Sequence, residues 1–515
     1  MKKEINQLKA GTLITYITII ISTIIPLLYT PVMLRILGQA EYGLYSLSNS
    51  VISYLSLLTL GLGTTITRYI MKYRTAGDKV MLERVAGLFI LIYVVISLIT
   101  MVTGFGISLF TETFFSNGLA SEEINKLRIL IVIMTISAAF SIIPGVYSTI
   151  IICYEKYIFR KLMDMILTIA SPILNLVVLY MGLASIGMAL LSLAVQIIVF
   201  VINVFYCNKK LNIHPSLKNP PKELLKPIFS FTVFVFIGLI ADLLYWATDK
   251  VLIGAMVGSV AVAVYNIGST FNAMLQNLSS AISGVFGPRV NTYVFENRPI
   301  SELSKLMIRV GRLQYLIVSL VLSGFIIFGQ KFLYFWAGSD YSESYYVALL
   351  TMLPLAIPLI QNIAFTTISA QNKHQFRSIL YAVLAVANVV GTYFLIPIMG
   401  VVGAALCTCI VFILGHGLLM NWYYYKKIGL NIPLFWKNIL RMTIIPVLWG
   451  SIYVAIDYYL LADMSSLIDL LVRIIVYTIV FCLLTWFFTM NRYEKDLFKS
   501  MVLKINFLKK RKNGN

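Results

Sequence analysis

Charged residues are scarce in this chain. They make up 12% of its 515 residues, whereas 59% are hydrophobic. A chain of this composition has too little polar surface to cover itself in water, so a soluble globular protein is excluded. Many apolar runs reach the roughly 20 residues that a helix needs to cross a bilayer, and lipid obliges the backbone to bond within such helices. We therefore predict an all-α, polytopic membrane protein.

The apolar runs predict about fourteen transmembrane helices. They lie at residues 11–34, 43–67, 85–110, 129–152, 163–181, 185–206, 228–247, 258–286, 310–330, 346–369, 378–397, 400–423, 440–459 and 467–489.

Acidic residues are fewer than basic ones, 21 against 41, which gives a net charge of +20. Once the spans are drawn, 35 of the 41 lysines and arginines fall on the side of the N-terminus. This asymmetry follows the positive-inside rule, which predicts that both termini are cytoplasmic. Topology and attraction to anionic membrane lipids account for the basic charge, and no nucleic-acid partner is expected.

Metal-binding and nucleotide-binding patterns are missing too. The three histidines and five cysteines show no ligand spacing, and no GxxxxGK[ST] loop occurs. We expect no metal, no cofactor and no catalytic residues. The basic start precedes an apolar run too long for a signal-peptide core, so we expect it to be a retained first helix.

The chain contains an internal repeat. Residues 37–50 align with 257–270, 153–160 with 370–377, and 187–190 with 403–406. Each copy holds six predicted helices, an even number, so the two copies have the same orientation in the membrane. We predict an N-terminal lobe (1–206), a cytoplasmic linker (207–227), a C-terminal lobe (228–427), two extra helices (428–490) and a basic cytoplasmic tail (491–515). Two parallel lobes are typical of alternating-access transporters.

Polar residues occupy one face of the predicted helix 258–286, including Tyr265, Asn272 and Gln276. The repeat places Tyr45 and Asn49 on the matching face of helix 43–67. Polar side chains facing lipid are costly, so this face points to other helices or to a water-filled cavity. The repetition in both lobes favours a substrate-binding cavity, with hydrogen bonding between helices as the alternative.

Charged residues at the predicted spans are few and are functional candidates for that reason. Arg35 and Lys250 match the anionic oxygens of a phosphate-bearing substrate, and the alternative is that they extend to the outer interface. Asp242 and Asp249 are acidic candidates, and for Asp242 a structural salt bridge is the alternative.

Three motifs carry a family resemblance: "TPVMLRILGQAEYGLY" (30–45), "GLGTTITRY" (61–69) and "DKVLIGAMVGSVAVAVY" (249–265). With them the chain resembles the multidrug/oligosaccharidyl-lipid/polysaccharide exporter superfamily, and within it the Wzx-type O-antigen and lipopolysaccharide flippases and polysaccharide transporters. The resemblance covers most of the chain. Fourteen helices exceed the twelve of many Wzx proteins, and helix one lacks the acidic residue of several drug exporters.

The resemblance implies a transporter, not an enzyme, in the bacterial plasma membrane. Its substrate would be undecaprenyl-diphosphate-linked oligosaccharide, flipped outward for surface polysaccharide biosynthesis, with H⁺ or Na⁺ as the drive and polysaccharide polymerase machinery as a partner. Arg35 would meet the anionic substrate, and Asp242, Asp249 and Lys250 would serve substrate binding or ion coupling. The alternatives are a cation-coupled multidrug exporter and, less favoured, a membrane glycan polymerase or ligase.

Overall fold

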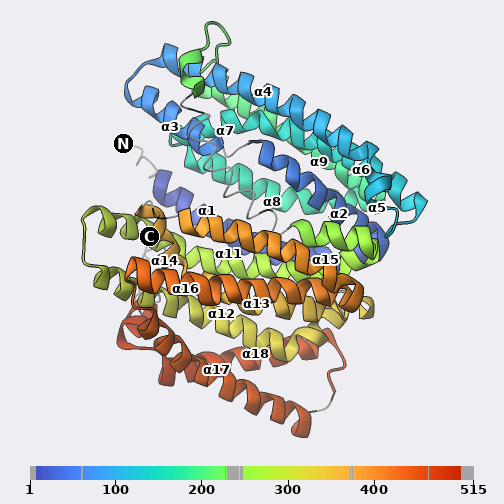
Figure 1. Ribbon diagram of the computed structural model, residues 1–515, viewed down its shortest axis with the longest axis vertical. Helices are drawn as coiled ribbons and strands as arrows, with labels where there is room; N and C mark the ends of the chain where they lie inside the picture. Colours follow the sequence, from blue (N-terminus) through green and yellow to red (C-terminus); the bar gives the residue numbers. More distant parts are fainter. Residues whose placement is uncertain are drawn as a thin grey trace, which may run out of the picture. The chain divides into compact units, whose positions relative to one another are not determined.

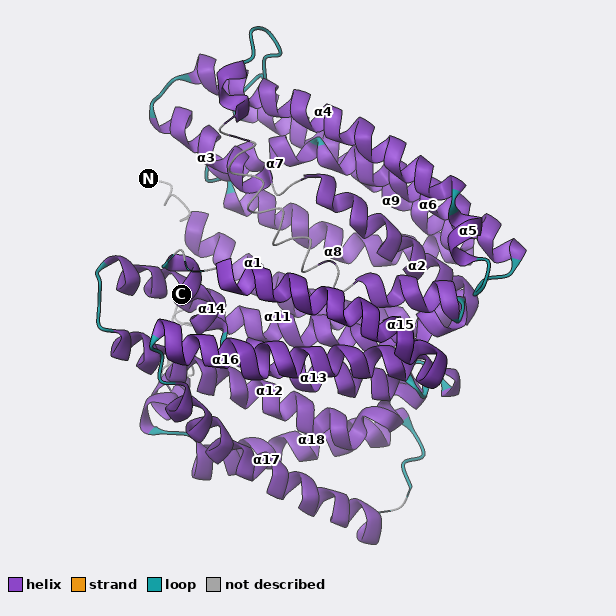
Figure 2. Cartoon of the chain, in the orientation of Figure 1, coloured by secondary structure: helices purple, strands orange, loops and turns teal. Residues whose placement is uncertain are grey.

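The computed structural model describes residues 7–59, 62–226, 228, 243, 247–371, 373, 375–461 and 463–499, and within these it contains helices and loops but no strand (Figure 2). This confirms the all-α fold. Among the described residues, 10 helices are long and apolar enough to cross a membrane.

The chain forms two compact units, one of residues 1–269 and 376–411, the other of 270–375 and 412–515. The helices of the first unit are α1 (Gln7–Leu37), α2 (Gln39–Leu55), α3 (Leu62–Thr75), α4 (Lys79–Leu109), α5 (Thr111–Phe115), α6 (Ser121–Ile142), α7 (Pro144–Cys153), α8 (Tyr157–Tyr180) and α9 (Ala184–Lys210). Two long helices, α11 (Ser259–Phe295) and α15 (Gln375–Phe412), belong mostly to one unit and extend into the other.

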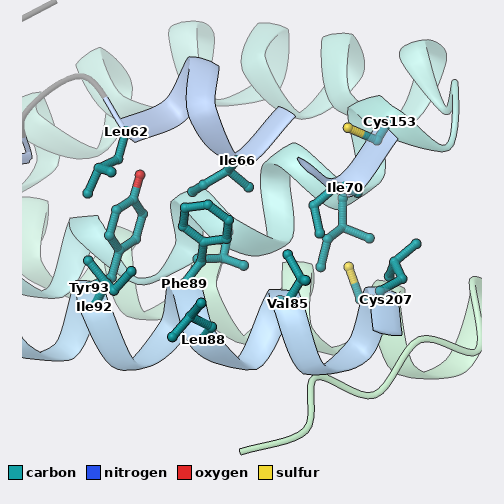
Figure 3. Packing of buried hydrophobic residues seen from close by; sticks show 14 of the residues in the cluster. Leu62, Ile66, Ile70, Val85, Leu88, Phe89, Ile92, Tyr93, Cys153 and Cys207 are labelled. Carbon is teal, nitrogen blue, oxygen red and sulfur yellow. The ribbon is translucent and has the colours of Figure 1, made fainter. Parts of the chain in front are cut away.

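In the first unit α4 packs against α6, and α6 packs against α9 (Figure 1). Helix α3 packs across α4 through a fully buried apolar core. Figure 3 shows Phe89 and Tyr93 of α4 extending toward Leu62 and Ile66 of α3. Burial of such side chains contributes roughly 1.5–3 kcal/mol each in water, although within lipid the gain comes from close packing.

The second unit is built on α12 (Ile300–Trp336), which packs against α13 (Ser344–Ile360), α17 (Ile432–Leu460) and α18 (Leu467–Leu484). It also contains α14 (Asn362–Ala370) and α16 (Met420–Tyr423), with π-helical turns at Ile413–Leu419, Tyr424–Ile428 and Thr485–Thr489.

A buried ion pair connects α12 to the helical residues 492–499 that follow the last span. Arg312 Nε lies 2.6 Å from Glu494 Oε1, and Nη2 lies 3.0 Å from Oε2. The Glu494 side chain is fully buried. Its carboxylate also accepts hydrogen bonds from the backbone N–H and the side-chain amide of Asn491. A two-point contact of this kind fixes both direction and register.

Several predicted spans are interrupted. The predicted helix 43–67 ends at Leu55, and α3 begins only at Leu62, beyond a 3₁₀ turn; glycine and hydroxyl residues there are weak helix formers. The span 129–152 divides at Pro144, which lacks the N–H needed to continue α6. The span 346–369 divides at Gln361, after two prolines.

Two spans predicted as separate, 378–397 and 400–423, meet within α15 at Gly400, whose backbone (φ 57°, ψ −137°) is not helical and divides α15 into two helices. The predicted span 228–247 lies largely outside the described residues, so the count of fourteen helices stays a prediction.

The internal repeat is visible in the backbone. Gly38 (φ 77°) precedes α2 and Gly258 (φ 127°) precedes α11, at the 220-residue offset of the sequence repeat. Ala184 (φ 47°) and Gly400 (φ 57°) match at the 216-residue offset. Such angles are unfavourable for most residues, so their recurrence at equivalent positions is specific. The division into lobes at 1–206 and 228–427 stays a prediction.

Candidate functional site

A cavity of about 520 Å³ lies inside the first unit. Helices α1, α2, α8, α9 and α11 and the helical residues 247–250 supply its wall. The lining residues are Tyr29, Met33, Tyr42, Tyr45, Ser46, Asn49, Ser50, Ser53, Asn175, Met188, Leu243, Ala247, Lys250 and Asn266. Phenols, hydroxyls and amides dominate this lining, and it contains one cation. Few sites within an apolar bundle could solvate a large polar group.

Lys250 begins a chain of polar contacts in the cavity. Its Nζ donates to Asn266 Oδ1 at 2.5 Å, and Asn266 Nδ2 donates to Tyr42 Oη at 2.5 Å. These hydrogen bonds connect the helical segment that contains Lys250 to α11 and α2. They hold the Lys250 ammonium group at the cavity wall, where it forms no salt bridge with a carboxylate of the described residues. An anionic ligand could therefore use this charge.

Asp249 points into a separate buried cluster and is only 2% exposed. Its carboxylate accepts hydrogen bonds from Tyr265 Oη (2.5 Å), Thr408 Oγ1 (2.8 Å), Asn388 Nδ2 (3.2 Å) and Thr392 Oγ1 (3.3 Å). Four neutral donors solvate this carboxylate where an ion pair would usually do so. The arrangement can hold a proton or a small cation, because hydroxyl and amide oxygens can turn from solvating the carboxylate to binding the ion.

Three of the predicted substrate-binding residues, Tyr45, Asn49 and Lys250, come together in the cavity. Tyr265 lies instead in the Asp249 cluster. Their binding roles remain predictions, but the cavity places them where a ligand would enter.

Asn272 and Gln276 belong to the second unit. Asn272 Oδ1 accepts a hydrogen bond from Thr351 at 3.1 Å, and Gln314 Nε2 donates to Ser279 Oγ at 2.9 Å. Gln276 is half-buried. At Asn272 and Ser279 the observed contacts are hydrogen bonds between helices, the alternative that the sequence left open.

Arg35 lies exposed in the last turn of α1 and does not line the cavity. Asp242 lies outside the described residues. Neither position therefore contributes to the geometry described above.

Sequence reasoning missed much of the site. In the cavity it missed Tyr29, Tyr42, Asn175 and Asn266, and in the Asp249 cluster Asn388, Thr392 and Thr408. A signal existed for two of these groups. Tyr42 precedes Tyr45 by one helical turn, and Asn388 and Thr392 are four residues apart on one face of an otherwise apolar helix.

Close backbone contacts surround one end of the cavity helices. A Cβ on Gly43 would lie 1.8 Å from the Ser259 carbonyl oxygen, and one on Gly118 would lie 2.4 Å from that of Gly254. Ser259 Oγ donates to Glu123 Oε1 at 2.5 Å. The starts of α2 and α11 are thus in direct backbone contact.

Glu41 lies in the first turn of α2, beside these contacts. Lys126 Nζ donates to Glu41 Oε2 at 2.5 Å, and the Ser185 hydroxyl donates to Oε1. Burial alone would raise the pKa of Glu41, but these hydrogen bonds outweigh it and hold the pKa below its usual value. The carboxylate therefore ties α2 to α6 and α9.

Among the residues that the structure describes, no three histidine, cysteine or acidic side chains are grouped so that they could hold a metal ion.

Comparison with known proteins places this architecture among characterised folds. The family model described as "Polysaccharide biosynthesis protein" matches residues 8–293. Membrane protein EpsK of Bacillus subtilis strain 168, described as uncharacterized, is 23% identical over 462 residues, covering 86% of this chain and 88% of EpsK. The probable low-salt glycan biosynthesis flippase Agl15 of Haloferax volcanii is 20% identical over 298 residues, covering 56% of this chain and 60% of Agl15.

Two solved structures share the fold. The lipid II flippase MurJ in an inward closed conformation has a TM-score of 0.72 at 14% identity, covering 95% of this chain and 99% of its own. An inward-facing multidrug resistance transporter of the MATE family has a TM-score of 0.64 at 15% identity, covering 81% and 96%.

Proposed function

The chain belongs to the polysaccharide biosynthesis protein family, and we propose that it is a flippase for undecaprenyl-diphosphate-linked oligosaccharide repeat units. It moves them from the inner to the outer leaflet of a bacterial plasma membrane by alternating access of two lobes, 1–206 and 228–427. Its termini are cytoplasmic, and it delivers substrate to polysaccharide polymerase machinery.

The observation that carries this proposal is the cavity around Lys250. A lipid-linked oligosaccharide presents two kinds of polar group, a diphosphate and sugar hydroxyls. The Lys250 ammonium suits the diphosphate, and the phenols and amides of Tyr45 and Asn49 suit sugar rings and hydroxyls. The protein mainly has to replace the water that solvates the head group, because a polar head group crosses the hydrocarbon core of the membrane poorly. The lipid tail stays within that core throughout.

The membrane potential favours outward movement of this substrate. With the cell interior negative, each negative charge moved outward gains roughly 2.3 kcal/mol per 100 mV. We assign ion coupling by H⁺ or Na⁺ to the buried Asp249 cluster, with Asp242 as a second candidate. Arg35, on the outer side of α1, is proposed to meet the diphosphate where it leaves the protein.

Lys250→Gln and Arg35→Gln test the proposal. The matched control is Lys331→Gln, which removes a cation predicted to lie on the same side of the membrane, at a residue that does not line the cavity. In cells that depend on this protein for surface glycan, Lys250→Gln should reduce the glycan at least tenfold. Lipid-linked oligosaccharide should then accumulate on the cytoplasmic leaflet while protein abundance stays normal. Normal glycan in the Lys250 variant would refute the assigned role of the cavity.

A cation-coupled multidrug exporter is the second candidate, favoured by the MATE-like fold and the Asp249 cluster. It predicts that overexpression raises drug tolerance and that deletion leaves surface glycan unchanged. A glycan polymerase or ligase is a third candidate, and product formation by the purified protein in detergent would support it over both transporters.

A further inference from the structure

An apolar groove runs along one side of α4, away from the cavity described above. Its volume is about 450 Å³. Six residues of α4 line it at helical spacing, namely Leu88, Leu91, Ile92, Val95, Ile96 and Ile99. Leu88, Ile92 and Ile96 are buried in the core with α3, whereas Val95 is 55% and Ile99 47% exposed. The groove therefore has a packed floor and one open edge.

The length of the groove matches one leaflet of a bilayer. From Leu88 to Ile99 the helix rises by about 16 Å at 1.5 Å per residue. Half of the roughly 30 Å hydrocarbon core is about 15 Å. Helix α4 is also one of the apolar spans long enough to cross the membrane. An acyl chain from one leaflet would fill this groove along its length.

The linker between the lobes closes the end of the groove nearer Lys79. The backbone N–H of Ser216 donates to the Glu83 carbonyl oxygen at 2.9 Å, and the backbone N–H of His214 donates to Glu83 Oε1 at 3.0 Å. A Cβ on Gly87 would lie 1.9 Å from the Ser216 carbonyl oxygen. These contacts fix the linker to α4 one turn before Leu88.

The same linker contributes a cation to the groove. Lys222 is exposed and lines the groove, and its ammonium group forms no hydrogen bond or ion pair with the residues that the structure describes. An apolar groove one leaflet long with an ammonium group contributed by the linker complements a lipid that has an apolar tail and an anionic head. A neutral lipid would use only the apolar part of this site.

We propose that the groove binds a glycerophospholipid with an anionic head group. One acyl chain lies along α4 between Leu88 and Ile99, and its phosphate meets Lys222. The lipid thereby joins the linker to the first lobe. A polyprenyl chain is much longer than one leaflet is deep and would extend beyond the groove, so the site is distinct from the proposed substrate site around Lys250.

The test uses the full chain in nanodiscs that contain equal amounts of phosphatidylglycerol and phosphatidylcholine, followed by gentle extraction and native mass spectrometry. The wild type should retain phosphatidylglycerol over phosphatidylcholine by about fivefold, the ratio expected for one lysine near an anionic head group. Lys222→Gln should bring this ratio close to one. Lys218→Gln, on the same linker but outside the groove lining, should leave it unchanged.

Val95→Trp fills the groove from its open edge and should remove the retained lipid of both kinds. Leu98→Trp places the same ring on the lipid-facing side of α4 outside the groove and should have no effect. Val95→Ser provides a second variant that weakens tail binding without added bulk, and thermal unfolding reports whether each variant is folded. Equal lipid retention by Val95→Trp and Leu98→Trp, an unchanged ratio in Lys222→Gln, or retention of only a polyprenyl lipid from native membranes would each overturn the proposal.

Discussion

The contact between Gly43 and Ser259 predicts a specific response to a single added methyl group. Gly43 is the fifth residue of α2, and Ser259 is the first residue of α11. An alanine Cβ at position 43 would lie 1.8 Å from the Ser259 carbonyl oxygen, against 3.4 Å for an ordinary contact, so the backbones must separate by about 1.6 Å. The oxygen belongs to the backbone and cannot turn aside as a side chain would.

The size of the effect follows from the cost of overpacking. Inserting a methyl group into a closed contact typically costs about 1–3 kcal/mol. A penalty of one or two kcal/mol changes a conformational ratio by a factor of about 5–30. In the proposed topology this contact lies on the outer side, so Gly43→Ala should shift the protein toward conformations in which the cavity opens outward.

Accessibility of the cavity measures this shift. Asn49→Cys, in a background without the native cysteines, would be exposed to a membrane-impermeant maleimide added outside intact cells. Labelling should rise at least fivefold when Gly43→Ala is added. Gly106→Ala is the control, because no atom lies within 4 Å of a Cβ at that helical glycine. Equal labelling in the two variants, with equal melting temperatures, would refute the reasoning.

Three further predictions concern other parts of the molecule. Asp249→Asn should remove the response of flipping to an imposed Na⁺ or H⁺ gradient in proteoliposomes, and a response equal to that of the wild type would reject ion coupling at this carboxylate. Arg312→Ala leaves Glu494 as an unpaired buried charge and should lower the free energy of unfolding by about 3–5 kcal/mol, whereas replacing both by Met and Leu should restore most of it in chemical denaturation. Since the folded-state pKa of Glu41 is lowered from 4.5, its stabilising contribution is present above that value and is lost as the pH falls through the folded pKa. The melting temperature of the wild type should therefore fall more steeply below about pH 4.5 than that of Glu41→Gln, and parallel curves would contradict this.

The fold class and the internal repeat could be recognised in the sequence because each is a property of long stretches of the chain. Hydropathy defines the membrane spans, and matched motifs define the repeat. Interruptions within the spans were harder to predict, because a broken helix and a continuous one can have the same hydropathy. At Pro144 the sequence does contain a local signal, since a proline lacks the N–H that continues a helix whatever packs around it.

The candidate site was only partly predictable for a different reason. Tyr45, Asn49 and Lys250 stood out as polar groups in apolar runs, and they do line one cavity. Asn388 and Thr408 come to Asp249 from 139 and 159 residues away in the chain. Periodicity shows which face of a helix is polar, but it does not show which distant helix that face meets.

The pair formed by Arg312 and Glu494 also bears on how the protein is made. The two residues are 182 positions apart, so Glu494 leaves the ribosome well after Arg312. Until then the Arg312 guanidinium lies within the second unit without the Glu494 carboxylate as its partner. A chain truncated before Glu494 leaves the positive charge of this guanidinium without a carboxylate partner. It also lacks the ion pair that connects α12 to residues 492–499. Formation of this pair therefore requires that α12 and the helical residues 492–499 are both in place.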